Sequence, residues 1–226
     1  MTRNKSAARF FPAAVLMAVL GFAAPSAHAA LTSIGLQEAG VNGGAITTVA
    51  TDAGAGTVTF NGSYGTFTSI SISAVGEPIT TSNELSTTAV ATSSAVPGVL
   101  IVFITEQGLG SDYALNDLTS NFSTVFMSSG TKTVLEETLV SLSNALFVGT
   151  FVGSTNFIAS PGGGSVTDYS QPLSGDFSVT EIYTITASKA GTANDNIDFQ
   201  TVPEPLSMLT LGTGLIGLGA LRRNRG

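Results

Sequence analysis

Val99-Leu100-Ile101-Val102-Phe103-Ile104 is an uninterrupted apolar run that follows Pro97–Gly98. A half-exposed strand alternates between apolar and polar side chains, whereas a short continuous apolar run suits a strand that is covered on both faces. We therefore expect Val99–Ile104 to be a β-strand at the centre of the hydrophobic core.

The sequence on either side of this run is typical of an all-β protein. It is rich in Thr, Ser, Val, Ile, Phe and Gly, and turn residues recur roughly every ten positions. Apolar residues alternate in Thr57–Phe60 and in Phe177–Ala187, and further strands are expected at Phe122–Met127 and Ala145–Val152. This pattern predicts an antiparallel β-sandwich, with which a jelly-roll order of the strands is compatible.

Turn residues give the expected boundaries between strands. Asn61–Gly62 is a two-residue hairpin signal, Ser129–Gly130 a turn and Pro161–Gly164 a flexible loop. The apolar phase slips in the strand that follows the first hairpin, which predicts a β-bulge near Thr68–Ser69.

Three segments need a choice between two interpretations. The leucines of Lys132–Asn144 are spaced as on one face of a helix, but the Thr and Val content suits a strand, which we favour. Glu181 is in phase with the apolar face of Phe177–Ala187, where a dry core would penalise its charge. We favour a strand end or a bulge that lets Glu181 reach water over a functional acid. Ala190–Thr201 is expected to be a last edge strand plus a linker.

Met1–Ala29 has the three parts of a secretory signal peptide. A basic n-region contains Arg3, Lys5 and Arg9, and an apolar h-region follows at Phe10–Ala24. The cleavage site is of the small-x-small kind and consists of Ala27, His28 and Ala29. Cleavage there would leave Ala30 as the first residue; an uncleaved N-terminal anchor is the alternative.

Val202–Gly226 combines three elements in order. Pro203-Glu204-Pro205 is stiff and extended, because each proline fixes φ and removes a backbone donor. Leu206–Leu221 is uncharged and as a helix would span roughly 24 Å, a little less than the roughly 30 Å of a bilayer core. The basic residues behind it would stop translocation and leave the upstream chain outside. They are Arg222, Arg223 and Arg225.

These three elements resemble the PEP-CTERM sorting signal of Gram-negative bacteria. The resemblance implies that an exosortase, a membrane cysteine transpeptidase-like enzyme, recognises the chain at Pro203, Glu204 and Pro205 and cuts nearby. It also implies export through the Sec machinery, transient anchoring by the C-terminal helix, and a final place in the envelope or outside the cell. The Phe-Ser-Val-Thr-Glu segment that begins at Phe177 is similar to one that recurs before such tails. An ordinary C-terminal membrane anchor is the alternative.

The expected organisation is a signal peptide at 1–29, an exported β-sandwich domain at 30–201 and a sorting tail at 202–226. A signal helix and a C-terminal transmembrane helix at 206–221 would flank the sandwich. Of the 15 acidic residues only Glu204 lies outside residues 30–201. Of the eight basic ones only two lysines lie inside, so the formal charge of this segment is 2 − 14 = −12. Such a domain repels nucleic acid and anionic lipid.

The residue types that are missing restrict the chemistry further. The single histidine, His28, belongs to the signal peptide, and the chain has no Cys and no Trp. The exported segment therefore has no Ser-His-Asp or Cys-His pair, no disulfide and no zinc site built on the usual ligands. We expect no enzyme activity, no cofactor and no resident metal.

Two weaker interpretations use carboxylates. A pair of them could hydrolyse a glycoside, but Glu136 and Glu137 are adjacent and would point to opposite sides of a strand. A polar cluster near the end of the domain offers oxygen ligands for calcium, although its spacing is not that of an EF-hand loop. It consists of Asn194, Asp195, Asn196 and Asp198.

Two Thr-x-Thr pairs, Thr57 with Thr59 and Thr66 with Thr68, could form a flat hydroxyl surface of the kind that some ice-binding proteins use. Two pairs do not make a repeating array, and threonine is common on the outer face of a sandwich.

The leading expectation is an exported, non-enzymatic structural or interaction protein of the envelope or extracellular matrix. Its association with the matrix or biofilm, with exopolysaccharide as a further partner, is implied by the family resemblance. A ligand-binding module for calcium, glycan or ice comes second, and a glycoside hydrolase that uses carboxylates alone comes third.

Overall fold

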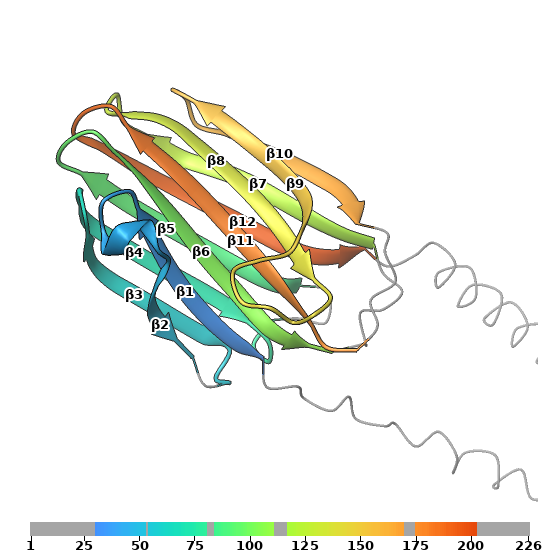
Figure 1. Cartoon of the computed structure of the whole chain (residues 1–226). Helices are drawn as coiled ribbons and strands as arrows, with labels where there is room; N and C mark the ends of the chain where they lie inside the picture. Colours follow the sequence, from blue (N-terminus) through green and yellow to red (C-terminus); the bar gives the residue numbers. More distant parts are fainter. Residues whose placement is uncertain (1–29, 53, 81–83, 111–116, 170–174, 203–226) are drawn as a thin grey trace, which may run out of the picture.

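The structure is a computed structural model. It describes residues 30–52, 54–80, 84–110, 117–169 and 175–202. These residues form twelve β-strands and one short 3-10 turn, Asn42–Gly44. The strands make two six-stranded antiparallel sheets that pack face to face (Figure 1). The predicted antiparallel β-sandwich is therefore confirmed.

Sheet A has the strand order β2-β1-β6-β11-β8-β9. Its strands are β1 Leu31–Glu38, β2 Thr47–Thr51, β6 Gly98–Leu109, β8 Thr131–Ser141, β9 Thr150–Ile158 and β11 Phe177–Ala187. Sheet B has the order β10-β7-β12-β5-β4-β3. Its strands are β3 Thr57–Tyr64, β4 Phe67–Gly76, β5 Glu84–Ser94, β7 Asp117–Met127, β10 Gly162–Tyr169 and β12 Gly191–Val202.

The connectivity from β5 to β12 brings distant parts of the chain together. Strands β10-β7-β12-β5 lie in sheet B, and β6-β11-β8-β9 lie in sheet A. The chain changes sheet at every step from β5 to β12 except between β8 and β9. This is the strand order of a jelly roll, to which β1–β4 add two further strands on each sheet.

The predicted core strand lies inside sheet A and is covered on both faces. Leu100, Val102 and Ile104 of β6 belong to the main core between the sheets. Phe103 points to the opposite face, where its ring lies 5.8 Å from the ring of Phe147. The continuous apolar run of Val99–Ile104 thus fills the core with alternate residues and anchors a loop with the others.

Other predicted strands are also found. Lys132–Asn144 is strand β8 over most of its length, and Phe177–Ala187 coincides with β11. The predicted slip near Thr68–Ser69 is confirmed, because the register of β4 against β5 shifts between Phe67 and Ser69. The choice of strand over helix for Lys132–Asn144 is confirmed as well, since every second side chain there faces the core.

The hairpin predicted at Asn61–Gly62 is wrong. Strand β3 continues to Tyr64, and Gly65 supplies the positive φ of the turn at 56°. The carboxylate of Glu38 fixes this later turn, because it accepts hydrogen bonds from the backbone nitrogen of Thr66 (3.0 Å) and from its hydroxyl (2.5 Å). A contact from a strand that is distant in sequence therefore outweighs the local turn signal.

The strand predicted at Ala145–Val152 is mostly loop, and β9 begins only at Thr150. Phe147 adopts a φ of 58° in this loop and is only 9% exposed. It packs with Phe103 and Ile182 on the outer face of sheet A. The apolar residues of this segment therefore cover the sheet instead of extending it.

The flexible loop predicted at Pro161–Gly164 is also wrong, because β10 begins at Gly162 and pairs with β7. A Cβ atom on Gly164 would lie 2.8 Å from the hydroxyl of Thr155 in β9. The glycine lets β10 pass close to β9, so it serves close packing between the two sheets.

The last described strand is central and not the predicted edge. Ala190–Thr201 corresponds to β12, which lies between β7 and β5. Ile197 and Phe199 are fully buried in the core. Of the polar residues that suggested an edge, Asn194, Asn196 and Asp198 point to the outer face, whereas Asp195 points into the core.

The expected signal helix and C-terminal transmembrane helix fall on residues 1–29 and 206–221, outside the described residues. Within residues 30–202, as far as they are described, no helix has the length and apolar character needed to cross a membrane.

Replacing Phe147 by Ala should lower the free energy of unfolding by about 3 kcal/mol, because it removes a buried aromatic side chain and uncovers its neighbours. Phe151→Ala is the matched control, since that side chain is 56% exposed and its loss should cost less than about 1 kcal/mol. Urea denaturation of the two variants measures the difference. Equal destabilisation would show that the loop does not cover sheet A.

Candidate functional site

The outer face of sheet B carries small polar side chains in straight rows across five strands. Directly opposite residues of an antiparallel pair lie on the same face, so the strand register defines each row. One row consists of Asn61, Ser71, Ala91, Asn194 and Phe126 on β3, β4, β5, β12 and β7. The next row, on the same strands, consists of Thr59, Ser73, Ala89, Asn196 and Ser123.

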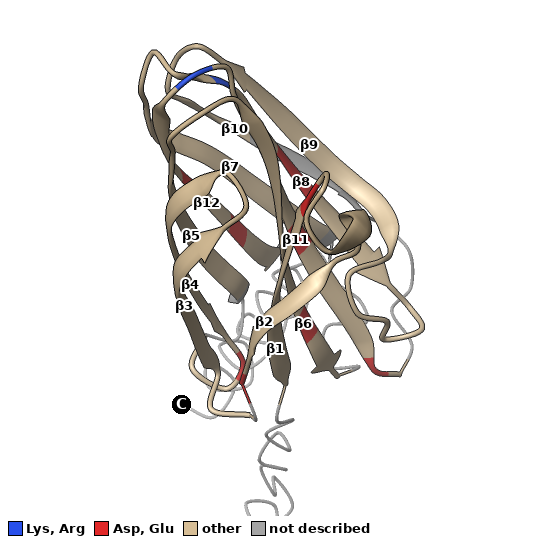
Figure 2. Cartoon of the chain, turned by 60° about the vertical axis from the view of Figure 1, so that its left-hand side comes forward, with Lys and Arg blue, Asp and Glu red and all other residues tan. Residues whose placement is uncertain are grey.

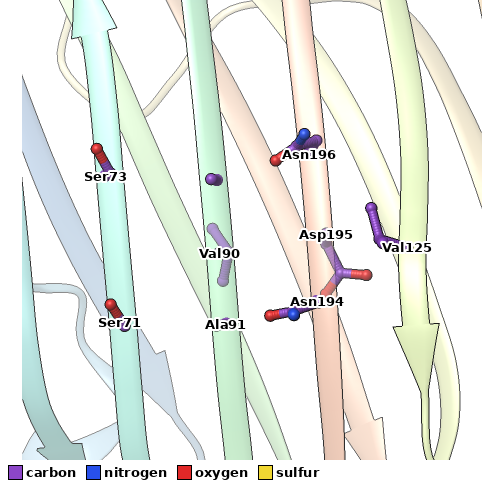
Figure 3. Close-up of a pocket in the computed structure, with 9 residues that line it drawn as sticks. Ser71, Ser73, Val90, Ala91, Val125, Asn194, Asp195 and Asn196 are labelled. Carbon is purple, nitrogen blue, oxygen red and sulfur yellow. The ribbon is translucent and has the colours of Figure 1, made fainter.

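A shallow groove of about 250 Å³ runs over these rows (Figure 3). Its floor is β5, because the outward side chains of Ala89 and Ala91 end in methyl groups. Longer side chains on the two neighbouring strands flank this floor with hydroxyl and amide groups. They are Ser71, Ser73, Asn194 and Asn196.

The amide of Asn196 is held by the backbone around it. Its nitrogen is placed to donate to the carbonyl oxygens of Thr88 (3.2 Å) and Asp195 (3.1 Å). The amide oxygen then remains as the acceptor for a ligand. Asn194 is exposed, so the oxygen and the nitrogen of its amide are both available at the same groove.

The residues around the groove expose little charge. Asp195 borders the groove, but its carboxyl points into the core, where the Thr124 hydroxyl donates to it at 2.9 Å. Asp198 faces outward in the following row, and its carboxylate accepts a hydrogen bond from the Thr87 hydroxyl. The groove therefore presents neutral hydrogen-bonding groups.

A β-bulge borders the groove on β7. The register of β12 against β7 shifts between Asn194, which faces Phe126, and Asp195, which faces Thr124. Val125 is the extra residue and is 67% exposed, while Phe126 is 49% exposed. Bulges commonly re-aim side chains beside binding sites, and this one places two apolar side chains at the margin of a polar surface.

Four carboxyl groups lie in the core beneath these strands, each at most 2% exposed. They are Glu106 on β6, Glu136 on β8, Glu181 on β11 and Asp195 on β12. Figure 2 shows acidic segments within the sandwich, while the lysine segments lie together at one end. Lys132 and Lys189, the lysines of the described residues, are both exposed.

One threonine connects the two sheets through a buried carboxyl group and a buried tyrosine. The hydroxyl of Thr88 on β5 is hydrogen-bonded to the carboxyl of Glu181 and to the hydroxyl of Tyr183. Tyr183 is in register with Glu136 on β8. Among the described residues, no group makes a hydrogen bond of good geometry with either carboxyl oxygen of Glu136, although the backbone of Ser123 and the hydroxyl of Thr124 lie close enough to oppose the rise of its pKa.

These groups keep their protons at unusually high pH. Burial, with the nearby charge of Asp195, raises the pKa of Glu136 to about 9. Burial also raises the pKa of Glu181 to about 8 and that of Asp195 to about 7, although threonine hydroxyls oppose both shifts. The pKa of Glu106 is raised well above its usual value by burial, against a hydrogen bond from the backbone of Glu77. Protonation lets the core contain carboxyl groups without a buried counter-ion.

The structure corrects the expectation for Glu181. It does not reach water at a strand end or bulge, but lies in the middle of β11. A protonated carboxyl bonded to Thr88 is tolerated there, which a count of apolar residues in the sequence does not reveal.

The structure separates the proposed calcium ligands. Asn194, Asn196 and Asp198 point outward from β12 while Asp195 points inward, because successive strand residues face opposite sides. No three acidic, histidine or cysteine side chains in the described ranges are placed to hold a metal ion.

The remaining candidate residues have mixed outcomes. Glu136 is buried and Glu137 is partly exposed on the other face of β8, as predicted. Thr57 and Thr59 lie on the outer face of sheet B, whereas Thr66 bonds to Glu38 at a turn, so the two threonine pairs form no common array.

The targeting residues fall outside the described ranges. They are Ala27, Ala29, Pro203, Glu204, Pro205, Arg222, Arg223 and Arg225. The groove residues Ser71, Ser73, Ala89 and Ala91 were not predicted. Their signal in the sequence is the alternation of small outward residues with buried apolar ones in β4 and β5.

Raising the pH from 5 to 9 should lower the free energy of unfolding. The unfolded chain loses these protons near pH 4, whereas the folded protein keeps those of Asp195, Glu181 and Glu136 up to about pH 7, 8 and 9. The stabilisation is complete below the unfolded pKa and is lost as the pH rises through the folded values. Each group lowers the free energy of unfolding only until the pH reaches its folded pKa, by roughly 1 kcal/mol per pH unit up to that point.

Urea denaturation at pH 5, 7 and 9 measures this dependence. Glu136→Gln should flatten it and leave the variant more stable than the wild type at pH 9. Glu137→Gln, which changes the adjacent outward residue, should follow the wild type. A wild-type free energy of unfolding that stays constant over this range would contradict the buried protonated cluster.

The chain matches no protein-family model and no curated protein. Fifteen chains of solved structure match it. One is the enzymatically active domain of bacteriophage CBA120 tailspike protein 4, at 12% identity and a TM-score of 0.35 over 66% of this chain and 20% of the tailspike chain. A second is TmCBM61 in complex with beta-1,4-galactotriose, at 10% identity and a TM-score of 0.34 over 63% of this chain and 92% of the other. A third is the exo-1,3/1,4-beta-glucanase of a Pseudoalteromonas species, at 11% identity and a TM-score of 0.31 over 76% of this chain and 19% of the other. Similarities this remote assign neither a family nor a ligand.

Proposed function

We propose that this chain is an exported, non-enzymatic interaction protein of the bacterial envelope or extracellular matrix, and that it binds its partner through the outer face of sheet B. The observation that carries the proposal is the neutral groove on that face. Its hydroxyl and amide groups are arranged in register by three neighbouring strands, β4, β5 and β12. A rigid sheet holds such groups more precisely than a loop does.

The placement of the acidic groups supports a binding role over hydrolysis. Glycoside hydrolysis needs two carboxyl groups on either side of an accessible bond. Glu106, Glu136, Glu181 and Asp195 are buried between the sheets, where a polymer has no access. Among the described residues, none of these groups faces the groove.

The export route rests on the two targeting segments of the sequence. Met1–Ala29 directs the chain to the Sec machinery, and the sorting tail Val202–Gly226 presents Pro203, Glu204 and Pro205 to an exosortase. The apolar segment Leu206–Leu221 serves as a transient membrane anchor until the tail is processed. The exported domain then resides in the envelope or in the matrix.

Replacing both Asn194 and Asn196 by Ala should reduce retention in the extracellular matrix, because it removes the two amides that flank the groove. Asn156→Ala is the control, since Asn156 is exposed on β9 of the other sheet. The measurement is the fraction of exported protein that stays with the matrix of a producing strain after washing. Equal retention of the double variant and the wild type would contradict the assignment of this face.

Deleting Pro203–Gly226 should change the location of the protein and leave its thermal stability unchanged, because strand β12 ends at Val202. Fractionation of a strain with an active exosortase should find the intact protein released from the membrane and the truncated form in a different compartment. Full-length protein that stays entirely in the membrane of that strain would favour a permanent anchor instead.

A further inference from the structure

We propose that the groove on sheet B binds a neutral polyhydroxylated glycan chain, with Phe126 and Val125 as the apolar contacts for its sugar rings. This inference rests on the proposed function, since it names the ligand of the same surface. The chemistry of the groove, the bulge beside it and its concave shape support it.

The polar groups of the groove suit sugar hydroxyls. A primary amide offers two donors and an acceptor, and a serine hydroxyl both donates and accepts. Asn194 and Asn196 on one side and Ser71 and Ser73 on the other therefore match groups that also donate and accept. A cationic or anionic ligand would find no exposed partner charge among these lining residues.

The charge of the exported segment narrows the ligand further. With the four buried carboxyl groups protonated, ten acidic residues against two lysines still give residues 30–201 a charge of 2 − 10 = −8, so the segment repels uronic-acid or sulfated polymers at long range. The hydrogen-bonding groups at the groove do not compensate for this repulsion. A neutral polymer is compatible both with the negative charge of the segment and with the uncharged groups of the groove.

The bulge on β7 supplies apolar contact area, which the hydrogen-bonding groups of the groove lack. Hydrogen bonds exchanged with water contribute little net affinity, and glycan recognition gains from contact with the apolar C–H face of a sugar ring. Phe126 is directly opposite Asn194 on the outer face, and Val125 projects beside it. Two exposed apolar side chains, re-aimed by a bulge beside two amides, form an amphipathic edge for such a ring.

The shape of the groove argues against an ice surface. Ice binding needs a flat, regular array, whereas Ala89 and Ala91 lie lower than the residues on both sides of them and make the surface concave. At about 250 Å³ the groove is slightly smaller than the roughly 300–1,000 Å³ of small-molecule sites. Individual sugar units should bind weakly, and a polymer with many units should be retained by repeated contacts.

The test is co-sedimentation of the full-length protein, kept soluble in a polyoxyethylene detergent, with insoluble polysaccharides. Cellulose, curdlan and cross-linked galactomannan are the neutral probes, and calcium alginate gel is the anionic one. We expect retention by at least one neutral polymer and none by alginate. Phe126→Ala and Asn194→Ala should each weaken that retention about tenfold, the factor that corresponds to about 1.4 kcal/mol.

Two variants on the other sheet serve as matched controls. Phe151→Ala and Asn156→Ala remove the same side chains from exposed positions on β9, and they should bind like the wild type. Retention by alginate, retention by none of the neutral polymers, or equal loss in test and control variants would each overturn the proposal.

The experiments also distinguish a wrong ligand class from a wrong binding face. Failure of all neutral polymers, combined with reduced matrix retention of the Asn194 and Asn196 double variant, would overturn the ligand class but keep the binding face. Thermal hysteresis of the full-length protein without binding to any polysaccharide would replace the glycan by ice.

Discussion

The contact of the Thr88 hydroxyl with Glu181 and Tyr183 joins the two sheets at the centre of the sandwich, and the rest of the structure depends on it. The three side chains come from β5 and β11, which lie far apart in the sequence. No cationic side chain of the described residues is buried beside Glu181, so this contact depends on Glu181 keeping its proton. Burial favours the protonated form and raises the pKa of Glu181 to about 8. A polar core of this kind constrains the sheets because a hydrogen bond specifies a position more closely than apolar contact does.

The same strands carry the groove on their other face. Thr88 is followed by Ala89, which forms the floor, and Asp195 stands between Asn194 and Asn196, which form one side. Alternation along a strand therefore places Ala89 next to the inward Thr88, and Asn194 and Asn196 next to the inward Asp195. On β4, by contrast, Ser71 and Ser73 alternate with buried apolar residues.

The sequence predicted the strands best where apolar periodicity decides the structure. Val99–Ile104 and Phe177–Ala187 were recognised because their side chains alone determine which face is buried. Asn61–Gly62 failed because Glu38, which is distant in the sequence, fixes a later turn. The groove could not be predicted either, since its rows exist only through the register of five strands, and register between distant strands has no local sequence signal. Buried acids such as Glu181 were missed because their partner lies on another sheet.

Strand β12, the last described strand, lies in the middle of sheet B and not at its edge. Ala190–Thr201 was expected to be a last edge strand plus a linker, yet residues 191–202 form strand β12 between β5 and β7. Sheet B and its groove are complete only with this strand, because β12 pairs with β5 on one side and with β7 on the other. Since Pro203 follows β12 directly in the sequence, the proposed cleavage near Pro203–Pro205 would leave that strand whole.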